Sequence, residues 1–297
     1  MLSALGCSAM RSLKGSAALV GATIGLAGCH HHETPRQAAP HYMVGSAWQG
    51  SDSWFYPAEH FDLNETGLAV IAAAPKGGVT ADGEIWSPDA MTGAHQTLQL
   101  PSVVTVRNLA NGRMVRIRLN DRGPSSAARV LAVTPRVATL LGMDTTPTPV
   151  EIVQDEAMSR QIAESNPNAP KLEISAAPRE AITAQSLDDG TTQTLGMKQN
   201  DREAGRQTLY VPDMPQTVMQ GQAQMPYYRV ILGSFSGHAA AARVAAQCGA
   251  DISQTAGVAG SLPWTVALGP FTAVSEADRA LAQARQCGGT GAHIVAR

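Results

Sequence analysis

The sequence is poor in charged side chains and has no marked excess of either sign. Of its 297 residues only 15% are Asp, Glu, Lys or Arg, and the formal net charge is −2. Nucleic acids bind proteins largely through clustered Lys and Arg, so this composition speaks against a nucleic-acid partner. After residue 29 the sequence contains no apolar run long enough to cross a membrane. The chain length favours about two domains.

The N-terminal residues have the features of an export signal rather than of a folded domain. Arg11 and Lys14 flank the start of the apolar stretch "GSAALVGATIGLAGC", which ends in small residues. The tetrapeptide "LAGC" (26–29) is similar to a bacterial lipobox. It predicts a signal peptide over residues 1–28 and lipid attachment to Cys29, which would anchor the chain in a membrane. The alternative is an ordinary secretory signal in which this cysteine is accidental.

The sequence has only four cysteines, and two of them remain once the N-terminal pair is assigned. Cys7 lies in the predicted signal peptide and Cys29 would carry lipid. An exported protein meets an oxidising environment, which favours a disulfide between Cys248 and Cys287; the alternative is two unpaired, buried thiols. The run His30–His32 has metal-binding chemistry, but adjacent histidines on a polar tether more often stay solvated. We therefore predict no metal site and no cofactor.

The middle of the chain has the pattern of a small β-rich domain. Residues 29–60 form a polar tether, and residues 61–154 alternate short apolar runs with turn signals. The clearest hairpin is "SVVTVRNLANGRMVRIRLN" (102–120), in which Asn111-Gly112 supplies a two-residue turn. Further on, "TPVEIV" reads as the closing strand of the domain.

A helix and then a linker follow the hairpin. The segment "TPRVATLLGM" predicts a short helix with Thr134 as its N-cap and Gly142 at its C-terminal end. Residues 155–225 are polar, interrupted by Pro and Gly, and without periodicity. We interpret them as a disordered linker.

The C-terminal residues 226–297 contain an internal repeat. "YRVILGSF" (228–235) and "WTVALGPF" (264–271) share the pattern V-x-L-G-x-F, and an Ala-rich helical stretch follows each. Strand, helix, strand, strand, helix and strand predict a compact α+β sandwich. If the repeated strands are adjacent and parallel, the two helices are parallel as well, and the cysteines at their C-terminal ends can meet.

The stretch "LNDRGP" (119–124) is the first candidate for chemistry. Asp121 continues the odd-numbered apolar series of residues 115–119, which predicts a carboxyl group on the apolar face at the end of a strand. Desolvation there would raise its pKa and suit it to proton donation, while Arg122 would lower the pKa. The same residues also form a self-bonded turn before Gly123-Pro124, and this stretch alone does not decide between the two. Taken alone, Glu84 and His95 are ordinary surface or turn residues.

Three motifs together resemble a known family. "TADGE" (80–84), "AHQTLQLPSVVTVRNLANGR" (94–113) and "VRIRLNDRGP" (115–124) are similar to the rare lipoprotein A family, septal lytic transglycosylases built on a six-stranded double-psi β-barrel. The repeated V-x-L-G-x-F resembles a sporulation-related repeat (SPOR) domain, an RNA-recognition-like fold that binds peptidoglycan strands stripped of stem peptides. The resemblance thus implies a mainly β barrel over 61–154 and an α+β SPOR domain over 226–297.

The resemblance also implies roles for individual residues. Asp121 matches the family's essential acid, Glu84 its G-E carboxylate and His95 its A-H imidazole, and the last two would line the cleft. Asn120 and Arg122 would contact substrate there. In the SPOR domain, Arg229 and Trp264 are available on the sheet to bind glycan, and both are also plausible as plain fold residues.

Several positions depart from the family pattern. An aromatic S-W-Y-G is replaced by "VIAA" (70–73), which removes a sugar-stacking surface. Ser87 and Ala132 stand where the family has Asp. Two functions therefore follow from the resemblance. One is endolytic cleavage of naked glycan strands at the division septum to give 1,6-anhydro ends, and the other is a glycan-binding structural lipoprotein whose barrel has lost its chemistry.

The implied partners are peptidoglycan, septal ring proteins and a membrane reached through the lipid anchor. Residue 30, after the lipidated Cys29, is His rather than Asp. In this family that favours the outer membrane, with the protein facing the periplasm. RNA binding through the RNA-recognition-like fold is disfavoured because the ribonucleoprotein signature is missing.

Overall fold

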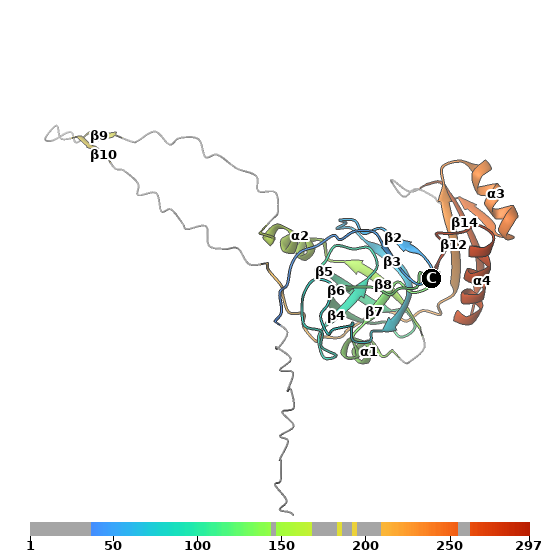
Figure 1. Ribbon diagram of the computed structural model, residues 1–297, viewed down its shortest axis with the longest axis horizontal. Coiled ribbons are helices and arrows are strands. Elements are labelled where there is room, and N and C mark those ends of the chain that lie inside the picture. Colours follow the sequence, from blue (N-terminus) through green and yellow to red (C-terminus); the bar gives the residue numbers. More distant parts are fainter. Residues whose placement is uncertain (1–36, 144–146, 168–182, 186–191, 195–208, 255–261) are drawn as a thin grey trace, which may run out of the picture. The chain divides into compact units, whose positions relative to one another are not determined.

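The computed structural model describes residues 37–143, 147–167, 183–185, 192–194, 209–254 and 262–297. Six strands close into a mixed barrel in the order β6-β4-β7-β3-β8-β5, and β5 pairs back to β6 (Figure 1). These strands are β3 (Asn64–Ile71), β4 (Thr92–His95), β5 (Ser102–Asn108), β6 (Arg113–Arg122), β7 (Leu131–Val133) and β8 (Thr148–Gln154). β4 runs parallel to β6 and β3 parallel to β7, while the other pairs are antiparallel. The predicted six-stranded double-psi barrel is confirmed.

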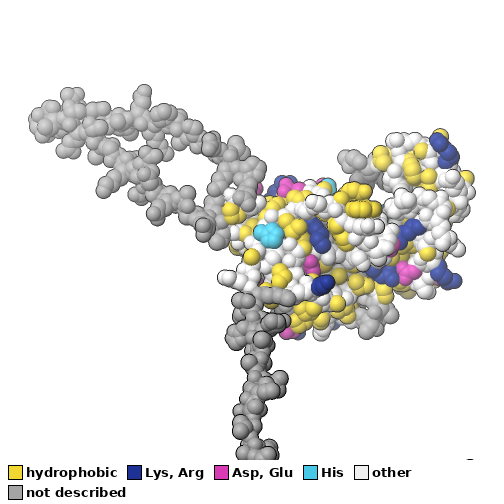
Figure 2. All heavy atoms as spheres, in the orientation of Figure 1, with side chains coloured by type: hydrophobic (Ala, Val, Ile, Leu, Met, Phe, Trp, Pro, Cys, Tyr) yellow, Lys and Arg dark blue, Asp and Glu magenta, His cyan; other side chains and the backbone are white. Residues whose placement is uncertain are grey.

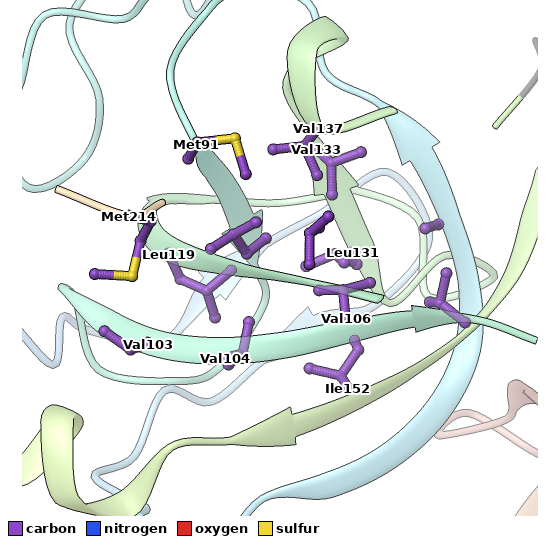
Figure 3. Close-up of a cluster of buried hydrophobic side chains, with 14 of the residues drawn as sticks. Met91, Val103, Val104, Val106, Leu119, Leu131, Val133, Val137, Ile152 and Met214 are labelled. Atoms are coloured by element: carbon purple, nitrogen blue, oxygen red, sulfur yellow. The ribbon is translucent and has the colours of Figure 1, made fainter. Parts of the chain in front are cut away.

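Branched aliphatic side chains fill the barrel. Val115, Ile117 and Leu119 alternate along β6 and are completely buried, as the sequence pattern predicts. Figure 3 shows Leu119 in this interior with side chains from the neighbouring strands and with Met214, which comes from far along the chain. A Cβ atom at Gly93 would lie 2.8 Å from the carbonyl oxygen of Ala132. The close approach of β4 to β7 therefore requires glycine there.

The predicted hairpin and helix both form, with one difference. β5 and β6 pair antiparallel, but residues 109–112, rather than Asn111-Gly112 alone, connect them. Gly112 has φ +76, a conformation that side chains disfavour. Helix α1 (Pro135–Leu141) begins after Thr134, whose hydroxyl accepts from the Val137 N–H, and ends at Gly142 in the left-handed conformation.

The described part of the predicted N-terminal tether, residues 37–60, has regular structure and is attached to the barrel. β1 (Trp48–Gln49) and β2 (Trp54–Phe55) form a small hairpin. Its connection is fixed to the barrel, because the Asp52 carboxylate accepts from the Ser126 hydroxyl (2.8 Å) and from the Ala127 N–H (2.9 Å). Residues 37–60, predicted as a tether, are therefore attached to the barrel; the rings of Trp48 and Phe55 pack on each other, while Trp54 and Tyr56 are exposed.

The predicted disordered linker over 155–225 is also wrong at both ends. Helix α2 (Glu156–Ser165) begins immediately after β8, capped by the Asp155 carboxylate, and buries Ile162 completely. Short strands β9 (Thr183–Gln185) and β10 (Thr192–Thr194) pair with each other. β11 (Met219–Gln220) then adds to the edge of β6. The polar composition of this segment hid α2, because the helix buries only Ser159 and Ile162.

The C-terminal domain has a four-stranded antiparallel sheet in the order β13-β14-β12-β15. Along the chain its elements are β12 (Tyr228–Phe235), α3 (His238–Cys248), β13 (Asp251–Gln254), β14 (Trp264–Phe271), α4 (Val274–Gln286) and β15 (His293–Ala296). Figure 1 shows both helices on the same side of this sheet. Small residues of α4 allow close packing, because Ala277 and Ala284 are completely buried against it. The predicted α+β sandwich is confirmed.

One premise about this domain was wrong. The repeated strands β12 and β14 are adjacent, but they run antiparallel. The reason is that β13 and β14 form an antiparallel pair, which reverses the chain after the first helix. Cys248 and Cys287 nevertheless form a disulfide, with their Cα atoms 5.4 Å apart.

We expect this disulfide to contribute much of the stability of the small domain. It closes a loop with a sequence separation of 39 residues, for which loop-closure entropy corresponds to about 4 kcal/mol. Calorimetry of the full chain should show the C-terminal transition shifting down on reduction. A Cys248→Ser/Cys287→Ser variant should start at the lower temperature and should not respond to reductant. A transition unchanged by reduction would contradict this prediction.

The predicted signal peptide, Cys29 and the His30–His32 run lie outside the described residues. Within the described ranges, no helix combines the length and apolar character that a membrane span requires. Figure 2 shows charged side chains scattered over the visible face rather than gathered into one basic patch. This distribution agrees with the low charge content of the sequence.

Candidate functional site

The end of β6 carries Asp121 on a different face from the one predicted. Leu119 pairs with Gly93 of β4, but Ala94 pairs with Asp121, so Asn120 is an extra residue in the ladder. Such a β-bulge interrupts the in-out alternation of a strand. Because paired residues project from the same face and Gly93 and Ala94 alternate, Asp121 points away from the side that Leu119 occupies. The carboxyl group therefore lies on the outer wall of the barrel, not in its apolar mouth.

The backbone holds one oxygen of Asp121 and leaves the other without a partner among the described residues. Oδ1 accepts from the Ala81 N–H (2.9 Å) and from the Arg122 N–H (2.8 Å). Burial raises the pKa of the Asp121 carboxyl, although these two N–H groups and the Arg122 charge act against the rise. Gly123, two residues after the acid, has φ +138, so the chain turns away where β6 ends. The arrangement fixes the group and favours its protonated form.

Glu84 lies beside the same strand, in contact with side chains of β6. Its Oε2 accepts from Arg118 Nη2 at 2.7 Å and from Asn120 Nδ2 at 3.0 Å. The Arg118 and Glu84 side chains are only 8% and 14% exposed, so this ion pair is largely removed from water. Glu84 and Asp121 are further linked through one segment, since Asp121 binds the N–H of Ala81, three residues before Glu84.

A row of small, uncharged side chains continues the outer face from Asp121. Ala94 of β4 pairs with Asp121 and also with Ala132 of β7, which in turn pairs with Val70 of β3. The two alanines are buried. Ala132 is a position where the resemblance implies an Asp, and Val70 opens the segment where it implies aromatics. Both departures therefore lie in line with Asp121, not elsewhere in the barrel.

His95 does not join Asp121 and Glu84 in the way that the resemblance implies. It pairs across the ladder with Arg122, and its neighbour Ala94 pairs with Asp121, so the imidazole projects from the other face of β4. Nδ1 accepts from the N–H groups of Thr97 and Leu98, which places the ring hydrogen on Nε2, 2.6 Å from Glu65 Oε1. The ring is 2% exposed. Its observed contacts make it a buried anchor for the β4 turn.

Arg122 also uses its side chain inside the protein. The guanidinium donates to the backbone carbonyl groups of Val44, His95 and Leu98. Burial lowers the pKa of Arg122 to about 10, against the attraction of Asp121, so the group remains charged at neutral pH. It therefore ties the N-terminal segment to the barrel next to the acid.

The two residues predicted in the SPOR sheet lie on opposite faces of it. Trp264 lies on the helix side, where its ring meets that of His238 of α3 at 4.7 Å. Arg229 lies between the core residues Tyr228 and Val230 along β12, so it projects from the other face. The sequence could not show this, because a strand's face is fixed by what packs on it. The two do not form one binding surface.

Sequence reasoning missed three charged residues of this region: Glu65, Asp82 and Arg118. Alternation along β6 places Arg118 on the outer face, and this pattern could have predicted a charged partner for the carboxylate of the "TADGE" motif. Glu65 lies 30 residues from its partner His95, and no local pattern joins them. No cluster of potential metal ligands occurs within the described ranges.

The fold and the motifs agree with the family models that the chain matches. Residues 48–152 match the lytic transglycolase model, and residues 224–296 match the SPOR domain model. The chain therefore contains a double-psi barrel of the lytic transglycolase class followed by a SPOR domain. The resemblance to the rare lipoprotein A family is confirmed.

Curated relatives carry the corresponding name. "Endolytic peptidoglycan transglycosylase RlpA" of Escherichia coli K12 is 38% identical over 102 residues, which are 33% of this chain and 28% of the relative. Proteins of the same name are 37% identical over 123 residues in Pseudomonas aeruginosa PAO1, covering 41% of this chain and 35% of the relative, and 34% identical over 105 residues in Rickettsia felis, covering 34% and 46%. The matched part thus spans less than half the length of these relatives.

Proposed function

We propose that this protein is an endolytic lytic transglycosylase that cleaves peptidoglycan glycan strands, with Asp121 as its general acid. The observation that carries the proposal is the state of Asp121. One carboxyl oxygen is fixed by two backbone N–H groups, the other has no partner among the described residues, and burial raises the pKa. A carboxyl group prepared in this way can hold a proton and donate it. The name of the relatives supports the reaction class.

The proposed step consumes no water. The Asp121 proton passes to the glycosidic oxygen between N-acetylmuramic acid and N-acetylglucosamine, and the C1–O bond breaks. The glucosamine leaves with a free 4-hydroxyl. The muramic 6-hydroxyl then attacks C1 and returns its proton to Asp121, which closes the 1,6-anhydro ring. One carboxyl group serves as acid and then as base, whereas hydrolytic glycosidases use a pair.

Glu84 serves by holding the segment that binds the acid, since Ala81 in that segment donates to Asp121. Its Oε2 is held by Arg118 and Asn120, which fixes its position without leaving it free to exchange protons with Asp121. We assign to Glu84 and Asn120 the positioning of the segment 80–84 against the bulge beside Asp121. Arg122 serves by placing Asp121, and His95 by holding the turn after β4 through Glu65.

The SPOR domain concentrates this activity on its substrate. SPOR binding to strands without stem peptides would bring the barrel to the division septum and raise the local substrate concentration there. Arg229 is the candidate contact on its sheet. Lipid on Cys29 would hold the protein in the outer membrane facing the periplasm, beside septal ring proteins.

Arg229→Ala should weaken the sedimentation of the protein with denuded sacculi, because it removes the candidate glycan contact on the sheet. Arg243→Ala, an exposed change on α3, serves as the control and should sediment like the parent.

The direct test is release of soluble glycan fragments from sacculi. The full chain with Cys29→Ala, to avoid lipid, is incubated with sacculi that have or have not been treated with an amidase. We expect release mainly from the treated sacculi, because their strands lack stem peptides. Binding of the treated sacculi without any release would instead support the second function, a glycan-binding structural lipoprotein. The row of small, uncharged side chains at Ala94, Ala132 and Val70 favours this alternative, because it offers neither a second carboxylate nor an aromatic ring beside Asp121.

The rate of glycan cleavage should fall as pH rises. The reaction needs Asp121 protonated, and burial raises its pKa above the ordinary 3.8. The protonated fraction therefore falls as pH rises through the raised value, and the rate on amidase-treated sacculi should fall with it. A rate that increases steadily from acid to neutral pH would contradict the assignment of Asp121 as acid.

A further inference from the structure

A second carboxyl group is buried beside Glu84 and has no role in the reaction described above. Asp82 is completely buried. Its Oδ1 accepts from the Thr80 hydroxyl (2.7 Å) and from the Glu84 N–H (3.2 Å). Its own N–H donates to the carbonyl oxygen of Asn120 at 3.2 Å. Asp82 thus holds the turn that carries Glu84 and binds that turn to the bulge beside Asp121.

The two carboxyl groups each leave one oxygen buried and without a partner in the described part of the chain. These are Oδ2 of Asp82 and Oε1 of Glu84. An ionised carboxylate has only acceptors, and a buried acceptor without a donor is costly. A proton on one of the two carboxyl groups removes part of that cost, because it removes one buried charge. Glu84 has Arg118 and Asn120 on its other oxygen, so the proton belongs on Asp82.

We propose that Asp82 is a positioning residue that carries a proton below neutral pH, so that its buried side chain holds the turn against Arg118 without adding a second charge. The charged groups that bear on Asp82 are Glu84, which disfavours its ionisation, and Arg118, which favours it. Burial and the Glu84 charge together raise the pKa of Asp82 to about 7. This inference concerns the site of the proposed function, but its main test does not depend on activity.

The sign of the pH effect follows from linkage. An ordinary Asp titrates near 3.8, as it would in the unfolded chain, whereas folded Asp82 titrates near 7. Between these values Asp82 binds more protons in the folded than in the unfolded chain, so its contribution to stability falls as pH rises. Asp82→Asn keeps the acceptor for Thr80 and Glu84 and replaces the hydroxyl by an amide donor. The melting temperature of the variant should therefore lie several degrees above that of the parent at pH 8, and the two should be equal at pH 4.

The experiment compares melting temperatures of the full chain, Asp82→Asn and Asp89→Asn across this pH range. Asp89 is exposed in the same segment, so its variant controls for the chemical change alone. A melting difference between Asp82→Asn and the parent that is the same at both pH values, or a variant that melts below the parent at pH 8, would overturn the proposal.

A second measurement needs no Asp82 variant. The Glu84 amide signal, followed by NMR in the parent, should titrate with a midpoint near neutral pH because this N–H binds Asp82. In Glu84→Gln the transition should persist with a lower midpoint, since the charge that opposes ionisation is gone. A single midpoint below about pH 5 in the parent would overturn the proposal, because a carboxyl with an ordinary pKa titrates there. Loss of sacculus cleavage with these titrations intact would count against the proposed function alone.

Discussion

Asp121→Asn should abolish glycan cleavage while leaving the barrel folded. General acid catalysis contributes about 100- to 10,000-fold to a rate. The side-chain amide of Asn cannot donate a proton in the pH range in which a carboxyl group does. The amide oxygen of Asn can still accept from the N–H groups of Ala81 and Arg122, which are the contacts of Oδ1 in the parent. We therefore expect the melting temperature to change little. The measurement is the release of soluble fragments from amidase-treated sacculi.

Asp62→Asn is the matched control, because Asp62 is exposed just before β3. It should cleave at the parental rate. Sacculus binding through the SPOR domain should be the same in all three proteins. If Asp121→Asn cleaved within a few fold of the parent, Asp121 would not be the acid.

Arg118→Met should produce the largest loss of stability among changes near the site. Its guanidinium neutralises Glu84 at 2.7 Å in a place where both side chains are largely buried. Removing one partner of such a pair leaves an uncompensated charge and costs about 3–5 kcal/mol. Methionine retains the apolar stem of the side chain, so the loss reports the charge rather than a cavity. Urea unfolding of the full chain measures it.

A double-mutant cycle with Glu84→Gln isolates the interaction. Because Gln carries no charge, the double variant should be more stable than Arg118→Met alone. Two additive losses would mean that Arg118 stabilises the barrel independently of Glu84, and the account of Glu84 as a held charge would be wrong.

The fold was largely predictable because its signals are local. Alternation along β5 and β6, the glycine at 112 and the caps at Thr134 and Gly142 each determine the backbone within a few residues. The order of strands around the barrel is not local, and here it rested on the resemblance. The ends of the linker were missed because α2 needs only Ile162 and Ser159 buried to hold it in place.

The site was less predictable, since it depends on one irregularity and on distant partners. The presence of Asp121 at the end of β6 could be predicted, but its face could not, because the bulge at Asn120 arises from pairing with β4. His95 binds a glutamate from another strand, and Trp264 packs under α3. These contacts follow from tertiary packing, which the spacing of residues within one segment does not contain.

The chemistry of the new chain ends tests the central claim most directly. Fragments released from amidase-treated sacculi are collected in water enriched in heavy oxygen and examined by mass spectrometry. We predict muramic ends that are lighter by one water than hydrolysed ends and that carry no heavy oxygen. New ends that are hydrolysed and contain the solvent oxygen would show that water attacks C1, and would contradict a mechanism in which the muramic 6-hydroxyl closes on C1.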